Sequence, residues 1–149
     1  QDTDGATLRI AADLVDHGVD INDLALKMYG LDQRRLEILK VCLNTYKITE
    51  KGTAYYIFTK EEMERLNMTV DQGNLHINMF RDLKNVKAAV SVTWDEGNQH
   101  YRISLRSARI YVSPVAVQFH GGGHDYSAGC SIKSLDELPS LLEAVDQLQ

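Results

Sequence analysis

The densest group of residues that could do chemistry is the segment Phe119–His124, which reads FHGGGH. Three consecutive glycines remove every Cβ, so the backbone can approach a ligand closely and turn its N–H groups toward a phosphate. The imidazole of His124 can then donate a hydrogen bond, or gain a proton near neutral pH as an anion binds. A glycine-rich turn from strand to helix, with a solvated histidine, fits the same residues.

A metal site is the alternative use of these histidines. His120 and His124 stand four residues apart, a spacing that chelates zinc when both side chains project from one helix. The glycines between them argue against a helix, and no cluster of Cys, Asp or Glu completes a ligand set. We therefore predict no metal site in this chain and keep zinc binding as the weaker interpretation.

A second candidate is the alternating segment Tyr101–Ser107. Its apolar positions predict a strand with one face in the core, which places Arg102, Ser104 and Arg106 together on the other face. Two arginines flanking a hydroxyl make a good phosphate cradle, because one guanidinium binds two oxygens at once. A solvated outer sheet face is the alternative, but Arg106 and Ser107 end the strand just before the glycine run, which favours binding.

The elements that must position these residues follow from periodicity and punctuation. Apolar spacing predicts three short helices before residue 45, the first two ending at Gly18 and Gly30 and the third burying a stripe of Leu36, Leu39, Cys42 and Leu43. Alternation predicts strands at Thr53–Phe58, Val86–Trp94, Tyr101–Leu105 and Ala128–Ile132, and the turn residues 95–98 predict a hairpin between the middle two. Helices are expected after residue 59, across Leu75–Leu83, at Ser113–Val117 and near the end of the chain. The expected fold class is therefore α/β, a mixed β-sheet flanked by helices and preceded by a short helical connector.

Composition and charge limit the kinds of ligand that the chain is expected to bind. The 149 residues suit one folded domain, and the formal net charge of −5 argues against coating long nucleic acid or an anionic membrane. The charge is uneven, however, because residues 84–133 carry 6 basic and 3 acidic side chains. An anion site is therefore expected in this window, which contains both candidate motifs.

The remaining features concern the compartment and the ends of the chain. Cys42 and Cys130 fit neither a disulfide framework nor a Cys-only metal site, so we expect buried, reduced thiols in a cytoplasmic protein. No apolar run approaches membrane-spanning length. The opening residues 1–5 resemble a linker more than a gene start, so a piece of a longer protein is expected.

The order of these motifs resembles that of a known protein family. Ser104–Ser107, a short helix, the FHGGGH segment and Ser127–Gly129 are similar, in this order, to the C-terminal DHH-associated domain of DHH-family phosphoesterases. The branch that the sequence resembles is that of oligoribonucleases (nanoRNases) and 3′-phosphoadenosine-5′-phosphate phosphatases. The resemblance divides the chain into a helical connector at residues 1–45, following an absent N-terminal catalytic domain, and a substrate-binding domain at residues 46–149.

The resemblance implies a division of labour. In the family, the N-terminal domain carries an Asp-His-His motif and two divalent metals, usually manganese, whereas the C-terminal domain binds the substrate. No Asp-His-His motif occurs in this chain, so no catalytic residue and no metal are expected here. Carried over by motif, the residues that would hold the substrate are Arg106, Ser107, Gly121, Gly122, Gly123 and His124, with Ser104 and His120 as further candidates.

The implied function is the substrate-binding portion of a manganese-dependent phosphoesterase that hydrolyses short oligoribonucleotides, a nucleoside 3′,5′-bisphosphate, or both. A cyclic-dinucleotide phosphodiesterase, a single-strand exonuclease of the same family and a non-catalytic RNA-binding or dimerisation module are the alternatives. Expected partners are the small nucleotide or short RNA substrate, the N-terminal domain of the same polypeptide and a second copy in a homodimer. Many members have four glycines before the histidine, and His120 stands where the first would be, so substrate preference is left open.

Overall fold

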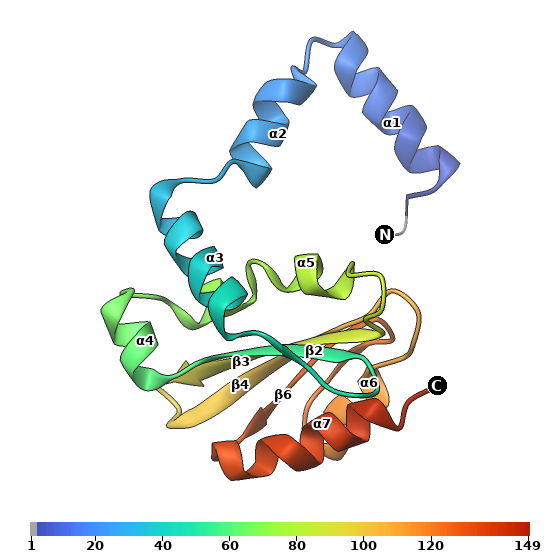
Figure 1. The fold of residues 1–149 in the computed structure, drawn as a ribbon. Helices are drawn as coiled ribbons and strands as arrows, with labels where there is room; N and C mark the ends of the chain where they lie inside the picture. Colours follow the sequence, from blue (N-terminus) through green and yellow to red (C-terminus); the bar gives the residue numbers. More distant parts are fainter. Residues whose placement is uncertain (1–2) are drawn as a thin grey trace. The chain divides into compact units, whose positions relative to one another are not determined.

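A computed structural model describes residues 3–149, which divide into two compact units, the first ending at Leu36 and the second beginning at Glu37. The first unit contains α1 (Gly5–Asp16), α2 (Ile21–Tyr29) and the start of α3 (Gln33–Thr45) (Figure 1). Neither α1 nor α2 has a buried residue. Both helices end as predicted, before a glycine at which the chain turns.

The second unit contains the sheet and the helices that cover it. Its elements are α3 (from Glu37 onward), β1 (Lys47–Ile48), β2 (Thr53–Phe58), α4 (Lys60–Arg65), the 3₁₀ turn η1 (Val70–Asn74), α5 (Ile77–Arg81), β3 (Ala88–Asp95), β4 (His100–Arg106), α6 (Ser113–Gln118), β5 (Gly122–His124), β6 (Ser127–Ile132), the 3₁₀ turn η2 (Leu135–Glu137) and α7 (Leu138–Asp146). The sheet has six strands in the order β1-β2-β3-β4-β6-β5. Only the neighbours β2 and β3 are parallel, so the predicted mixed α/β fold is confirmed.

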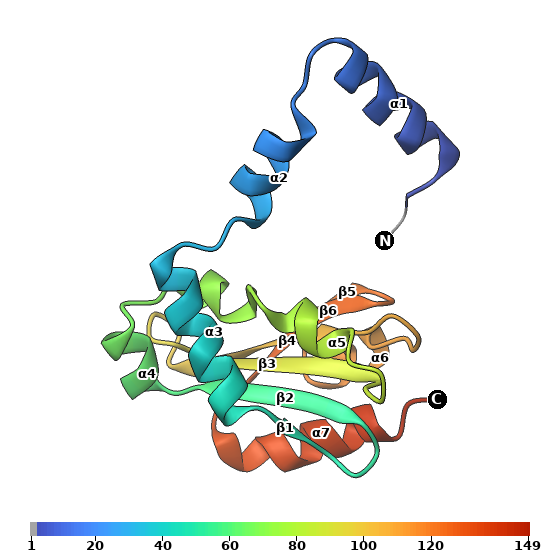
Figure 2. The same ribbon diagram turned by 45° about the horizontal axis from the view of Figure 1, so that its top comes forward.

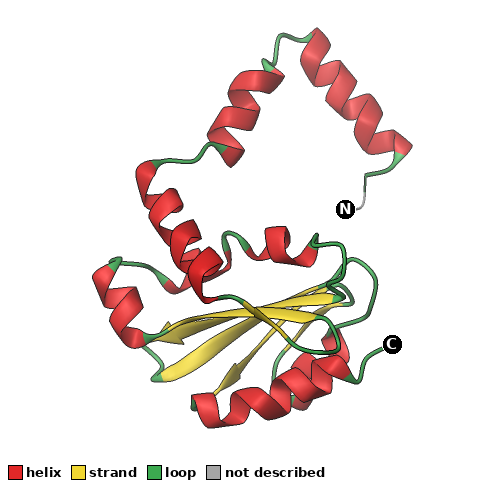
Figure 3. Ribbon diagram, in the orientation of Figure 1, coloured by secondary structure: helices red, strands yellow, loops and turns green. Residues whose placement is uncertain are grey.

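Helices cover both faces of the sheet, as Figures 2 and 3 show. On one face, α6 and α7 enclose a core with Val90, Val92, Ile103 and Leu105 of the central strands. On the other face, α3, α4 and α5 enclose a second core around Tyr56 and Phe58 of β2. The strands β2 and β3 are therefore buried on both sides, which explains their nearly continuous apolar sequences.

Three predicted details were wrong. The stripe that α3 buries is Ile38, Val41 and Cys42, whereas Leu36 and Leu43 are exposed, because the helix presents a face rotated from the leucine stripe. The predicted helix across 75–83 is shorter than expected, because only Ile77–Arg81 forms α5 and the preceding 3₁₀ turn η1 already ends at Asn74. Finally, part of the glycine run is not a loop but the edge strand β5, and β1 was missed.

Turn η1 is fastened directly onto the sheet. The buried hydroxyl of Tyr56 donates a hydrogen bond of 2.9 Å to the carbonyl oxygen of Gly73. A Cβ on Gly73 would lie 2.0 Å from the Thr93 hydroxyl oxygen, so only glycine permits this close approach. The consequence is that Asn74, the next residue, is held against the sheet beside β4.

Both cysteines are free and buried, and burial raises the pKa of each thiol to about 12. Such thiols stay protonated at neutral pH and are poor nucleophiles. Among the helices of residues 3–149, none combines the length and the apolar character needed to cross a membrane.

Candidate functional site

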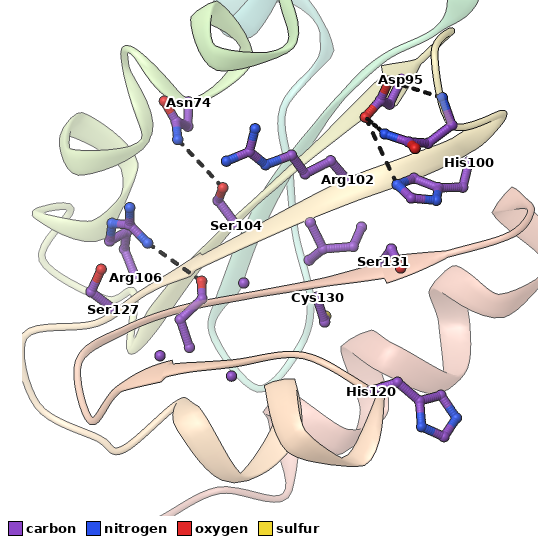
Figure 4. A pocket seen from close by; sticks show the side chains of 16 residues that line it. Asn74, Asp95, His100, Arg102, Ser104, Arg106, His120, Ser127, Cys130 and Ser131 are labelled. Atoms are coloured by element: carbon purple, nitrogen blue, oxygen red, sulfur yellow. Dashed lines mark hydrogen bonds and ion pairs between the residues drawn. The ribbon is translucent and has the colours of Figure 1, made fainter.

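A groove of about 600 Å³ lies on the face of the sheet that α3, α4 and α5 share. These helices pack on β2 and β3, whereas the groove extends over β4, β6 and β5. Arg102, Ser104 and Arg106 line it from β4, as Ser127, Gly129 and Ser131 do from β6. The predicted placement of the three β4 side chains on one face is therefore confirmed (Figure 4).

Strand register arranges the groove in rows. Ser104 pairs with Gly129, which pairs with Gly122, and directly opposed residues in a sheet project from the same face. This row has almost no side-chain volume and forms the floor of the groove. A parallel row contains Arg106, Ser127 and His124, which gives the floor one polar border.

Arg106 is the chemically distinctive residue of the groove. Its guanidinium Nη1 donates to the carbonyl oxygens of Leu105 at 2.9 Å and of Ala128 at 3.4 Å, which holds the half-buried side chain in place. Burial, and secondarily the positive charge of Arg81, lower the pKa of Arg106. Among the described residues no carboxylate forms an ion pair with it. A partly desolvated cation without a counter-ion is a strong attractor for an anion.

The opposite border of the groove, at Arg102, is more exposed, and its positive charge is already paired with a carboxylate. Arg102 donates to the Asp71 carboxylate at 2.8 Å, but both side chains are at least half exposed, so solvent weakens the pair. Between the two arginines, the Ser104 hydroxyl accepts a long hydrogen bond of 3.5 Å from the Asn74 amide. An incoming ligand can therefore use the Ser104 and Asn74 polar groups with little rearrangement.

Ser107 does not line the groove. Its side chain is buried, and its hydroxyl donates to the carbonyl oxygen of Lys87 at 2.7 Å. The same hydroxyl oxygen accepts from the backbone N–H groups of Arg109 and Ile110, both at 3.0 Å. Ser107 therefore stabilises the turn that follows β4, next to Arg106.

The three consecutive glycines differ in whether the fold requires glycine at their position. A Cβ on Gly121 would lie 2.1 Å from the carbonyl oxygen of Gly129, and one on Gly123, where φ is +144°, would lie 2.6 Å from the Ala128 Cα. These two glycines allow β5 to pair closely with β6. A Cβ on Gly122 would meet nothing within 4 Å and would extend into the groove, so the fold does not require glycine there.

The two histidines are separated by the strand. His124 is exposed at the end of β5 and belongs to the Arg106 row, although it is not part of the groove wall. His120 lines the groove at the end of α6 and points away from Arg106 in Figure 4. Within residues 3–149 no group of three or more His, Cys, Asp or Glu side chains is placed to hold a metal ion.

The DHHA1 domain family matches residues 49–149, which include every β-strand of the groove. This chain belongs to that family. The match confirms the expected DHH-associated domain of a DHH-family phosphoesterase. The strand β4, the short α6 and the glycine-containing β5–β6 hairpin described above thus lie within the matched region.

Two similar proteins support the expected oligoribonuclease and PAP phosphatase branch. The chain is 23% identical over 142 residues to the bifunctional oligoribonuclease and PAP phosphatase NrnA of Bacillus subtilis (strain 168), covering 95% of this chain and 45% of that protein. It is 29% identical over 136 residues to the NrnA of Mycoplasma genitalium, covering 91% and 42%. The DHHA1 chain therefore spans less than half the length of these curated relatives.

Two solved structures share the fold. An exopolyphosphatase-related protein from Bacteroides fragilis aligns with a TM-score of 0.85 at 23% identity, covering 97% of this chain and 44% of that one. A pGpG-specific phosphodiesterase, PggH from Vibrio, aligns with a TM-score of 0.54 at 14% identity, covering 98% and 51%.

Sequence reasoning missed two residues near Arg106. Arg81 of α5 raises the local positive charge, and Asn74 of η1 lines the groove. Both come from segments about 20 to 26 residues before the start of β4, and neither lies in an alternating or glycine-rich pattern. Only the packing of η1 and α5 on the sheet brings them to the site.

His120 occupies a position that favours glycine. It has φ of +59° directly after α6, where its N–H donates to Val117 and the N–H of Gly121 donates to Ala116, the hydrogen bonds of a Schellman motif. A side chain in this left-handed conformation costs about 1 kcal/mol. This gives a physical reason for the additional glycine that many family members have here.

We therefore expect His120→Gly to raise the free energy of unfolding by about 1 kcal/mol, because the strain at φ of +59° disappears. His120→Ala is the control, since alanine keeps a Cβ and should give no gain. The measurement is urea denaturation of the three proteins. A destabilised glycine variant would show instead that contacts of the imidazole outweigh the strain.

Proposed function

We propose that this DHHA1 domain is the substrate-binding portion of a manganese-dependent phosphoesterase that hydrolyses short oligoribonucleotides, a nucleoside 3′,5′-bisphosphate, or both. The observation that carries the proposal is the half-buried Arg106, held by two carbonyl groups and without an acidic partner among the described residues, beside a floor of small residues. The names of the NrnA relatives supply the substrate classes.

The groove suits a phosphate ester in three ways. Arg106 can donate two parallel hydrogen bonds to phosphate oxygens. The nearby Arg81 is paired with the exposed Asp82, so Arg106 is the main cation of this part of the groove. The floor of Ser104, Gly129 and Gly122 allows the ligand to approach the backbone closely. We propose that His124, at the end of the Arg106 row, contributes a further hydrogen bond to the phosphate or the sugar.

Arrangement along β4 favours an oligonucleotide over a single phosphate group. Arg102 and Arg106 project from the same face four residues apart, a separation of roughly 13 Å at the usual strand rise. Hydroxyl groups of Ser104 and Ser131 lie on the same groove face. A ligand with two phosphate groups, whether a short oligonucleotide or a nucleoside 3′,5′-bisphosphate, can therefore engage both arginines.

The residues present do not fit the two metals that the family implies. Among residues 3–149, no suitable group of three ligands exists; His120 lies in the turn after α6, whereas His124 ends β5. We propose that the metals and the chemical step belong to a separate DHH domain, and that this chain binds and orients the substrate for it. No step of hydrolysis is assigned to residues of this chain.

The proposed separation of substrate binding from catalysis can be tested directly on this chain. We expect the 149-residue chain, supplied with manganese and a 5′-phosphorylated dinucleotide, to show no hydrolysis above buffer, because it lacks a metal-ligand cluster among its described residues. Product formation is measured by chromatography of the nucleotides. Manganese-dependent turnover that co-purifies with the chain and disappears in Arg106→Ala would overturn the proposed division.

Arg106→Ala should weaken binding of a 5′-phosphorylated dinucleotide by at least tenfold, since a charge-assisted, bidentate contact is lost. Calorimetric titration measures the affinity, and thermal unfolding checks that the domain stays folded. Arg65→Ala, which removes an exposed arginine of α4, is the matched control and should bind like the wild type. Lost cooperative melting with unchanged affinity per folded molecule would show Arg106 to be structural.

Gly122→Val separates the needs of the ligand from those of the fold. The new side chain has open space, so stability should change little, but it fills the groove and should weaken dinucleotide binding at least tenfold. Gly123→Ala is the contrasting variant, since its Cβ would collide with Ala128 and should lower the melting temperature. Undiminished affinity in Gly122→Val would place the ligand elsewhere.

A further inference from the structure

Two exposed tyrosines form a ring pair beside the turn between β5 and β6, next to the groove-lining Ser127 in the sequence. Tyr111 lies in the segment between β4 and α6, and Tyr126 lies in the turn between β5 and β6. Their ring centroids are 5.3 Å apart with an interplanar angle of 63°, yet the two residues remain 56% and 46% exposed. A tyrosine ring has an apolar face and a polar tip, so two paired rings open to solvent offer a surface on which a ligand ring can pack.

Backbone hydrogen bonds fix the pair in place. The N–H of Ser107 donates to the carbonyl oxygen of Tyr126 at 3.0 Å, and the N–H of Val112 donates to that of Asp125 at 2.7 Å. The buried Ser107 hydroxyl fixes the same segment through its three hydrogen bonds. The two rings are thus presented on a preorganised surface, which lowers the entropy lost when a ligand contacts them.

The pair adjoins the phosphate-binding row. Tyr126 immediately precedes Ser127, and Ser127 lies between Arg106 and His124 in the sheet register. Adjacent Cα atoms are about 3.8 Å apart, so the ring pair begins one residue beyond this row. In a nucleotide, one sugar joins the base to the phosphate, so a phosphate at Arg106 brings a base within reach of these rings.

We propose that Tyr111 and Tyr126 form a stacking platform for a nucleobase of the oligonucleotide whose phosphate Arg106 binds. The proposal rests on the proposed function, and it assigns to the site a preference for ligands that carry a base. Every base has a π-face, so the platform accepts all four bases and adds affinity without reading the sequence. The neighbouring arginines favour this occupant over an apolar protein surface, which has no use for the adjoining cationic row.

The test compares a ligand with bases to one without. Affinities of the 149-residue chain are measured by calorimetry for a 5′-phosphorylated diadenosine and for inorganic pyrophosphate. Tyr126→Leu keeps an apolar side chain but removes the π-face, so we expect about tenfold weaker dinucleotide binding and unchanged pyrophosphate binding. Tyr126→Phe should bind the dinucleotide like the wild type.

Two further variants control the experiment. Tyr111→Leu provides an independent test of the platform and should also weaken the dinucleotide selectively, which keeps the test decisive if Tyr126→Leu does not fold. Tyr29→Leu removes an exposed tyrosine of α2 in the other compact unit and should change neither affinity. Thermal unfolding and sedimentation are recorded for every protein.

Each outcome has one meaning. Wild-type dinucleotide affinity in both leucine variants, with affinity lost in Arg106→Ala, overturns the platform and leaves the proposed function standing. Equal weakening toward dinucleotide and pyrophosphate shows a structural role and also overturns it. A changed oligomeric state with unchanged dinucleotide affinity assigns the tyrosines to a protein interface, and a wild type that binds neither ligand overturns both proposals.

Discussion

The antiparallel pairing of β4 with β6, and of β6 with β5, is the constraint on which the site depends. It aligns Ser104, Gly129 and Gly122 in one row and Arg106, Ser127 and His124 in the next. Gly121 and Gly123 make this pairing possible because a Cβ at either position would collide with β6. The glycines that suggested a backbone phosphate site therefore act largely through strand pairing, and of the three only Gly122 leaves open space above it.

Unequal covering of the sheet leaves an open groove over these paired strands. One face is packed by α6 and α7, and the other is packed by α3, α4 and α5 mainly over β2 and β3. The groove lies beside that second helical layer, so Arg106 is partly desolvated while one side remains accessible. A guanidinium in such a position keeps its charge, because its ordinary pKa is so high that the lowering by burial leaves it protonated at neutral pH.

Much of this arrangement followed from local sequence patterns. Alternation at Tyr101–Leu105 correctly placed Arg102, Ser104 and Arg106 on one face. The helices expected after residue 59 and near the end of the chain are also present, as α4 and α7. The structure of the glycine run was harder to predict, because glycine is compatible with both loops and strands and β5 has no apolar alternation to mark it. Arg81, Asn74 and the Tyr111–Tyr126 pair could not be predicted, since long-range packing alone brings them to the β4 region. The role of Ser107 also depended on a buried partner, the carbonyl oxygen of Lys87, that no local pattern reveals.

The central claim is that the open face over β4, β6 and β5 binds a nucleotide phosphate. Chemical-shift mapping by NMR of the 149-residue chain during titration with a 5′-phosphorylated dinucleotide tests it most directly. The largest backbone amide shifts are expected at residues 102–107 and 121–131, together with Asn74 and Arg81. Saturable shifts concentrated instead at the pocket of Met63, Met68 and Trp94, or on α1 and α2, with the β4 and β6 amides unchanged, would contradict the claim.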